Sequence, residues 1–200
     1  MTDRKTADST DAVHAGETRG KPYDAVPMPI VQTATYTFED TAEIAELDPK
    51  ALKLVRRFKV EGCEEPSGLA IDQKNNRLYA GCGNKVMPVL DSRSGKTLAH
   101  VPIGDGVDAC DFDPSTGFAF ASTGDGHVTI IKETSPGKFE VVQTLDTQAS
   151  ARTMSLDKKT HRAYLPAAKM GPPPAATKEN PHPYPSMVAG TFTILVVGSE

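Results

Sequence analysis

The chain lacks several features that would place it in a familiar class. It has no tryptophan and only 6% aromatic residues among its 200 positions. No apolar run approaches the roughly 20 residues of a membrane-spanning helix, so we expect no membrane segment. The N-terminus, from Met1 to Lys5, is polar and continues so, without the apolar core of a secretory signal. As written, the chain is therefore expected in the cytoplasm.

An excess of positive charge is also lacking. The formal net charge is −4, whereas a general nucleic-acid binder carries a basic face, so we expect no nucleic-acid partner. The tightest basic group, Arg56, Arg57 and Lys59, lies in one predicted strand and is typical of a solvated strand face.

Three cysteines are too few, and too far apart, for a zinc site. Cys63, Cys82 and Cys110 show no C-x₂₋₄-C spacing, and the histidines show no ligand spacing. Cys63 and Cys82 can meet across neighbouring strands, as a disulfide in an oxidising compartment or as two small buried hydrophobes in the cytoplasm. Motifs for nucleophilic catalysis are missing as well. We predict no catalytic residue, no metal and no cofactor.

What the chain does have is an internal repeat. Ile71, Phe112 and Leu156 are 41 and 44 residues apart, and each is followed by Asp, a four-residue polar turn and a strand with an aromatic residue. Each Asp can accept a hydrogen bond from the turn backbone two residues on, and Gly117 suits a positive φ. Short strands at this period predict blades of a β-propeller.

The remaining strands complete the blades. The fold predicted is all-β, a partial β-propeller of about three four-stranded blades, in a domain over 49–200. An outer strand over 52–60 precedes blades at 66–103, 107–146 and 151–198. The last blade lacks an outer strand, which the stretch at 52–60 could supply. Closure normally takes four to eight blades, so we expect open blade edges that favour self-association.

Residues 49–198 resemble the YVTN/YncE-like β-propeller family. The likeness rests on Gly62–Ala70, Gly106–Ala109, Ala151–Met154 and the closing Gly190–Gly198. It implies a seven-bladed, quinoprotein amine dehydrogenase-like propeller of which this chain keeps the C-terminal half, in a family whose members are often exported.

Residues 11–47 resemble a different family. Ala12–Glu17, Val26–Phe38 and Glu39–Leu47 are similar to the N-terminal arm of the Cys/Met-metabolism pyridoxal-phosphate enzymes, such as cystathionine γ-synthase, methionine γ-lyase and O-acetylhomoserine sulfhydrylase. The resemblance stops near Asp48, before the family's cofactor-binding motifs, so pyridoxal phosphate is expected only if the arm reflects a complete enzyme. The joint near Asp48 is typical of a fragment or a fusion.

The N-terminal region itself is expected to be mostly extended. We predict a disordered tail over 1–10 and an arm over 11–48 with one short helix at 39–47, which Asp40 would cap with Glu43 closing a capping box.

Candidate binding residues come from the propeller topology, because residues just before each innermost strand line the channel mouth. These are Glu65 with Pro66, Asp105 with Asp108, and Ser150 with Arg152. Carboxylates and an Arg there could bind a small polar ligand or metal, or could satisfy backbone groups between blades. A proline-rich insertion over 171–186 is either a docking loop or a surface excursion.

Three functions compete. The first is a non-enzymatic binding or interaction module for an unknown small ligand or protein. The second is a pyridoxal-phosphate lyase or transferase, which only the arm supports. The third is a quinoprotein-like or hydrolytic propeller enzyme, which would need a full ring.

Overall fold

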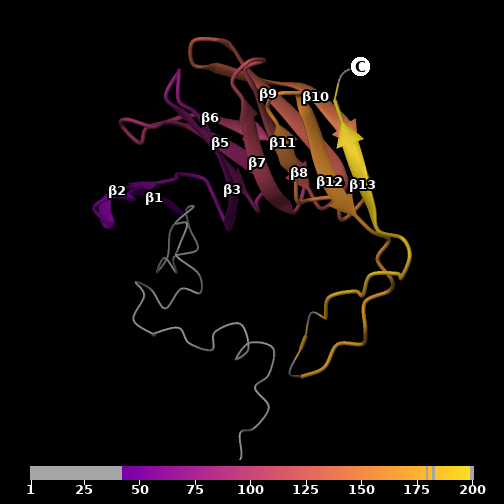
Figure 1. The fold of residues 1–200 in the computed structure, drawn as a ribbon. Coiled ribbons are helices and arrows are strands. Elements are labelled where there is room, and N and C mark those ends of the chain that lie inside the picture. The colour runs from indigo at the N-terminus through magenta and orange to yellow at the C-terminus, as the bar shows by residue number, and fades with distance from the viewer. Residues whose placement is uncertain (1–41, 179, 182, 199–200) are drawn as a thin grey trace, which may run out of the picture. The chain divides into compact units, whose positions relative to one another are not determined.

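The computed structural model describes residues 42–178, 180–181 and 183–198. All of its regular elements in these ranges are β-strands (Figure 1). The predicted tail over 1–10 and most of the predicted arm over 11–48 lie outside the described residues. Contacts group the described residues into two units, one of residues 45–56 and one of residues 42–44 and 57–198.

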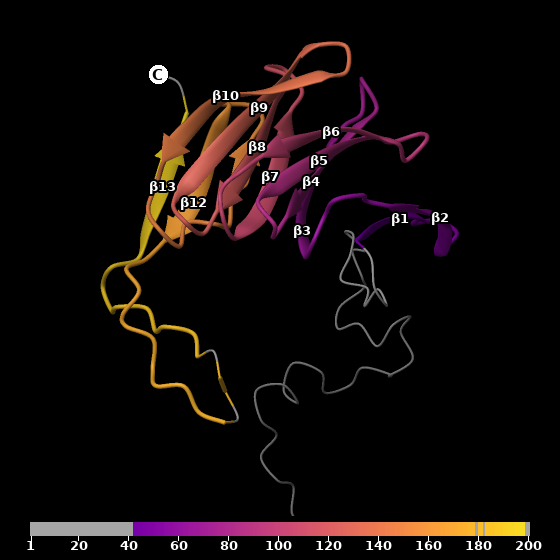
Figure 2. The same ribbon diagram turned by 180° about the vertical axis from the view of Figure 1, so that it is seen from behind.

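The larger unit is built from three antiparallel sheets whose strands follow chain order. The first sheet contains β3 (Pro66–Asp72), β4 (Arg77–Cys82), β5 (Val86–Asp91) and β6 (Thr97–Pro102). The second contains β7 (Val107–Asp113), β8 (Phe118–Thr123), β9 (His127–Ser135) and β10 (Lys138–Asp146). The third contains β11 (Ser155–Asp157), β12 (Arg162–Ala167) and β13 (Thr193–Val197). This architecture confirms the predicted all-β partial propeller (Figures 1 and 2).

The repeated turn forms as the sequence predicts. In each sheet the first hairpin closes with an Asp that accepts the backbone N–H two residues on, at 2.9 to 3.0 Å. The fourth turn residue has a positive φ each time, at Asn76 (57°), Gly117 (73°) and His161 (59°). A left-handed residue there lets the chain reverse within four residues, so the same hairpin recurs in all three sheets.

The core lies between consecutive sheets. One apolar cluster fills the space between the first and second sheets, around Tyr79, Met87, Phe112 and Ile131. A second fills the space between the second and third sheets, around Phe120, Ile130 and Leu165. Because strand side chains alternate, the second sheet buries both of its faces in this way.

A third cluster covers the remaining face of the first sheet. Leu78, Ala80 and Cys82 point to this face and pack against Val60 and Cys63. Partly buried Ala42, Ile44 and Phe58 join them. The chain on either side of the β1–β2 hairpin thereby takes the place that a preceding blade would occupy.

The hairpin of β1 (Glu43–Asp48) and β2 (Lys53–Lys59) corrects the predicted helix. The helix expected at 39–47 is wrong for Glu43–Leu47, which are strand; 39–41 lie outside the described residues. Nine residues are too few to hold an isolated helix in water. Ala42, just before β1, and Ile44 both join the same apolar cluster, and the Ala42 carbonyl accepts the Val60 N–H at 2.7 Å.

The same hairpin bears on the predicted blade closure. The sequence offers the stretch at 52–60 as a fourth strand for the last blade. In the structure β2 instead pairs with β1 in a separate two-stranded sheet, and the third sheet has three strands among the described residues.

Candidate functional site

The predicted channel-mouth residues lie at or a few residues before the first strand of each sheet. Glu65 precedes β3 with a positive φ of 48°. Its carbonyl accepts the Gly83 N–H at 3.2 Å, and a Cβ on Gly83 would lie 3.0 Å from its carboxylate. Glu65 is thereby engaged with a turn of its own sheet.

Asp105 is engaged across the first and second sheets. Its carboxylate lies 3.0 Å from the Lys85 ammonium, with both side chains more than half exposed. Its own N–H donates to Asp125 at 2.8 Å. Burial opposes ionisation of Asp125, but hydrogen bonds from Asp105 N–H and Thr123 outweigh it and lower the Asp125 pKa.

Asp108 and Arg152 are the two predicted residues that the structure brings together. The Asp108 carboxylate accepts the Thr153 hydroxyl at 2.7 Å, and Arg152 Nε lies 4.0 Å away. The Arg152 carbonyl accepts the Ser122 hydroxyl. This group joins the second and third sheets at their inner strands. A ligand at the channel mouth stays a prediction.

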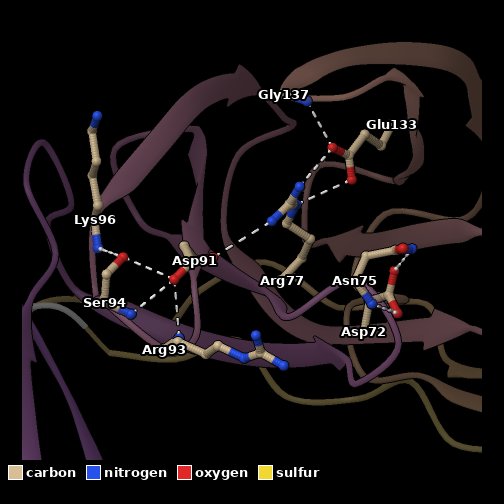
Figure 3. Close-up of polar contacts among 9 residues, drawn as sticks. All are labelled: Asp72, Asn75, Arg77, Asp91, Arg93, Ser94, Lys96, Glu133 and Gly137. Carbon is tan, nitrogen blue, oxygen red and sulfur yellow. Dashed lines mark hydrogen bonds and ion pairs between the residues drawn. The ribbon is translucent and has the colours of Figure 1, made fainter.

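Two further polar contacts between sheets are missed by the sequence. Arg77, at the start of β4, donates two hydrogen bonds to Glu133 of β9, at 3.1 and 3.0 Å (Figure 3). Burial would raise the Glu133 pKa, but the hydrogen bonds from Arg77 and from the Gly137 N–H lower it. No local pattern marks this pair, because its partners are 56 residues apart.

The second contact joins the second and third sheets. Asp113, whose side chain is buried, lies 2.7 Å from His161 Nδ1 and accepts the Ser115 hydroxyl at 2.8 Å. The sequence predicts His161 only as an exposed turn residue. Its ring remains partly exposed and contacts the aspartate of the equivalent turn in the second sheet.

Metal binding is not indicated by these groups. Within the part of the chain that the structure describes, no cluster of three or more His, Cys, Asp or Glu side chains is placed to hold a metal ion.

The sequence leaves two states open for Cys63 and Cys82, a disulfide or two buried thiols, and the structure has the disulfide. Cys63 and Cys82 are bonded, with Cα atoms 5.4 Å apart, inside the cluster that covers the first sheet. Cys110 is a free thiol packed between the first two sheets, and burial raises its pKa to about 12.

An aromatic–aliphatic cross-strand pair recurs in all three sheets, and its burial changes along the chain. The pairs are Tyr79 with Val89, Phe120 with Ile130, and Tyr164 with Val196. The first pair is 1% and 0% exposed, and the second 8% and 7%. The third is 36% and 54% exposed. In the first two sheets the pair packs against the next sheet along the chain.

We call the corresponding surface of the third sheet the open face, formed by Tyr164, Pro166, Ile194 and Val196. Ile194 is 48% exposed. The other face of the same strands carries Leu165, Leu195 and Val197, which pack into the core. These four side chains therefore form an apolar patch on a sheet whose opposite face is already buried. Ser155, Asp157 and Arg162 lie on the same side of the sheet.

The proline-rich insertion leaves the third sheet between β12 and β13. Met170 and Met187 form a β-bridge at its base, where Gly171 N–H donates to the Ser186 carbonyl at 2.8 Å. The chain between them extends away from the sheets (Figure 2).

The class that this architecture defines is a partial β-propeller. No protein-family model and no curated protein matches the chain. Among solved structures, it is similar to Kuenenia stuttgartiensis hydrazine synthase, with a TM-score of 0.57, 15% identity, and coverage of 65% of this chain and 37% of that one. A weaker likeness is to Saccharomyces cerevisiae Sqt1, with a TM-score of 0.49, 12% identity, and coverage of 54% and 30%.

These likenesses concern the fold. The chain spans little more than a third of the length of the hydrazine synthase structure it matches. The YVTN/YncE-like and pyridoxal-phosphate resemblances stay predictions. In the described residues, no helix is long and apolar enough to cross a membrane.

Proposed function

We propose that this chain is a non-enzymatic β-propeller interaction module that binds other protein through the open face of its third sheet. The observation that carries the proposal is the exposed Tyr164–Val196 pair, whose two counterparts are almost completely buried. Contiguous apolar side chains on a sheet face are typical of interaction sites.

The two buried counterparts of this pair, in the first and second sheets, indicate what kind of surface fits the open face. Tyr79 packs against Phe112, with ring centroids 5.7 Å apart, and its cluster includes Ala119 and Ala121. The cluster around Phe120 likewise contains Ala163 and Ala167. An aromatic side chain is thus received by a sheet that presents small residues beside one larger apolar residue. We infer that the partner presents a β-sheet surface of this composition.

Polar pairs between the sheets support the same function. Asp105 with Lys85, Asp108 with Thr153, and Arg77 with Glu133 each join neighbouring sheets. Such pairs hold the sheets in register, and a rigid scaffold presents the open face at a lower entropic cost of binding.

The test is affinity purification of the full chain from its source cells, followed by quantitative mass spectrometry. Ile194→Glu places a charge on the open face, where the exposed side chain leaves folding nearly unchanged. Desolvating an unpaired carboxylate costs on the order of 2 kcal/mol or more, so recovery of a true partner should fall at least about tenfold.

The matched control is Val142→Glu, which changes an exposed valine on β10 of the second sheet. It should recover the same partner as the unaltered chain. Equal recovery of every bound protein by all three forms would refute an interaction module that works through the open face.

A further inference from the structure

The unpaired edge of β13 sits where the other two sheets have a fourth strand. β5 is followed by β6 and β9 by β10, each antiparallel to its neighbour. In the third sheet, β13 pairs with β12 on one side, and no described strand pairs with its other side. Its outward backbone groups therefore form a template for one more antiparallel strand.

This edge lacks the features that protect the other two. β6 carries a register shift and ends at Pro102. β10 carries two register shifts and the charged pair Lys138–Glu140. β13, Thr193–Val197, pairs with β12 without a shift and has no charge, glycine or proline. Bulges, charges and prolines are what discourage edge pairing, so β13 is the edge most open to it.

The stretch at 52–60, which the sequence offers as the fourth strand of the last blade, is already paired. β2 pairs with β1 in its own sheet. A fourth strand for β13 must come from elsewhere, and it must run antiparallel to β13 to match the other blades.

We propose that β13 of a second copy of this chain fills the position, related by a two-fold axis that passes at Leu195. This goes beyond the proposed function, because the pairing uses the edge of β13 and leaves the open faces of both copies uncovered. A two-fold axis perpendicular to a sheet places two copies of one strand antiparallel, which is the required direction.

The register follows from the side-chain faces. With Leu195 opposite its own copy, Ile194 of one chain lies opposite Val196 of the other. Directly opposed residues of an antiparallel pair share a face, so the exposed side chains of both chains gather on one side. The core-facing Leu195 and Val197 continue the buried side. A register moved by one residue would turn one copy over and separate the two apolar faces.

Like charges do not oppose this pairing, because Thr193–Val197 is uncharged. The arrangement joins the Tyr164–Val196 pairs of both copies into one apolar surface across the new sheet. It also closes at two chains, since a two-fold contact uses the same patch on each copy.

The test is sedimentation velocity of the full chain over a wide micromolar range. The unaltered chain should show a monomer–dimer equilibrium. Ile194→Glu alone and Val196→Lys alone should each raise the dimer dissociation constant at least about tenfold, because each places an unpaired charge opposite an apolar residue. Circular dichroism should show both variants folded.

Mixing the two single variants gives the decisive result. The introduced carboxylate of one chain then lies opposite the introduced ammonium of the other, so a heterodimer should form where neither variant dimerises alone. The chain with both substitutions should dimerise again for the same reason. The matched control, Val142→Lys on β10, should dimerise like the unaltered chain.

Three results would overturn the pairing. They are a monomeric unaltered chain, no rescue by mixing, and a dimer that is abolished by Val55→Lys, at an exposed residue of β2, but not by Val196→Lys. Open-ended assemblies would also contradict a two-fold contact. If the pairing fails while Ile194→Glu still loses a captured partner, the proposed function stands without it.

Discussion

At the scale of single residues, one aspartate turn recurs through the described chain. Asp48, Asp72, Asp91, Asp113 and Asp157 each accept the backbone N–H two residues on. The residue four positions after each has a positive φ: Leu52, Asn76, Gly95, Gly117 and His161. The turn at Asp48 thus has the same form as that at Asp91, which is the likeness the sequence shows between 48–60 and 91–103.

Asp113 is the turn aspartate whose carboxylate also contacts a histidine of the next sheet. Burial opposes its ionisation, but hydrogen bonds from Ser115 and His161 outweigh burial and lower its pKa below 3.8. A depressed carboxyl pKa stabilises the fold above the unfolded-state pKa, and the contribution is lost as pH falls through the folded-state value.

We therefore expect Asp113→Asn to lower the free energy of unfolding by about 1–3 kcal/mol near pH 6. The difference between variant and unaltered chain should shrink as pH falls below about 3.8, since the asparagine does not titrate. Urea unfolding followed by circular dichroism at several pH values measures this. A difference that stays constant down to pH 3 would show that the carboxylate charge contributes nothing.

At the scale of elements, the disulfide holds the segment after β2 to β4. The bond joins Cys63 and Cys82, 19 residues apart, and both side chains are buried in the cluster on the first sheet. It fixes the covering segment on a face that would otherwise be as open as that of the third sheet.

Reduction should therefore destabilise the chain. A loop of this length contributes roughly 3 kcal/mol in the chain-entropy model. Urea midpoints with and without reductant, in the unaltered chain and in Cys63→Ser/Cys82→Ser, measure the effect. The double variant should be insensitive to reductant because Cys110, its one remaining cysteine, has no partner for a disulfide within the chain. Equal midpoints for the unaltered chain in both conditions would contradict a structural role for the bond.

At the scale of the whole molecule, stability should decline toward the third sheet. The first sheet is covered on both faces and the second lies between two sheets, whereas the third buries one face. In a repeat array each unit is stabilised mainly by its neighbours, so the unit with one neighbour opens most easily.

Hydrogen exchange measures this difference. At a concentration where the chain is monomeric, amides of Ala163 and Leu165 in β12 should exchange faster than those of Ala119 and Ala121 in β8, which occupy matching positions and are also buried. At higher concentration, the outward amides of β13 should gain protection if β13 pairs with a second copy. Identical exchange free energies for β8 and β12 would indicate one global unfolding unit instead.

The sequence by itself determined the blades. Period-two apolar strands, an Asp-led turn and a repeat of about forty residues are local signals, and each appears in the structure where the residues predict it. The four channel-mouth residues were placed at the inner strand starts for the same reason. The capping pattern of Asp40 and Glu43 could not fix the conformation of 43–47, because so short a helix depends on what it packs against.

Only the tertiary structure decided the rest. It bonded Cys63 to Cys82, joined Arg77 to Glu133 across sheets, paired β2 with β1, and left Tyr164 and Val196 exposed. Each of these depends on which segments meet after folding. In the sequence, the Tyr164–Val196 pair follows the same aromatic–aliphatic pattern as its two buried counterparts. Whether such a pair is core or surface depends on the presence of a next sheet, and no local pattern encodes that.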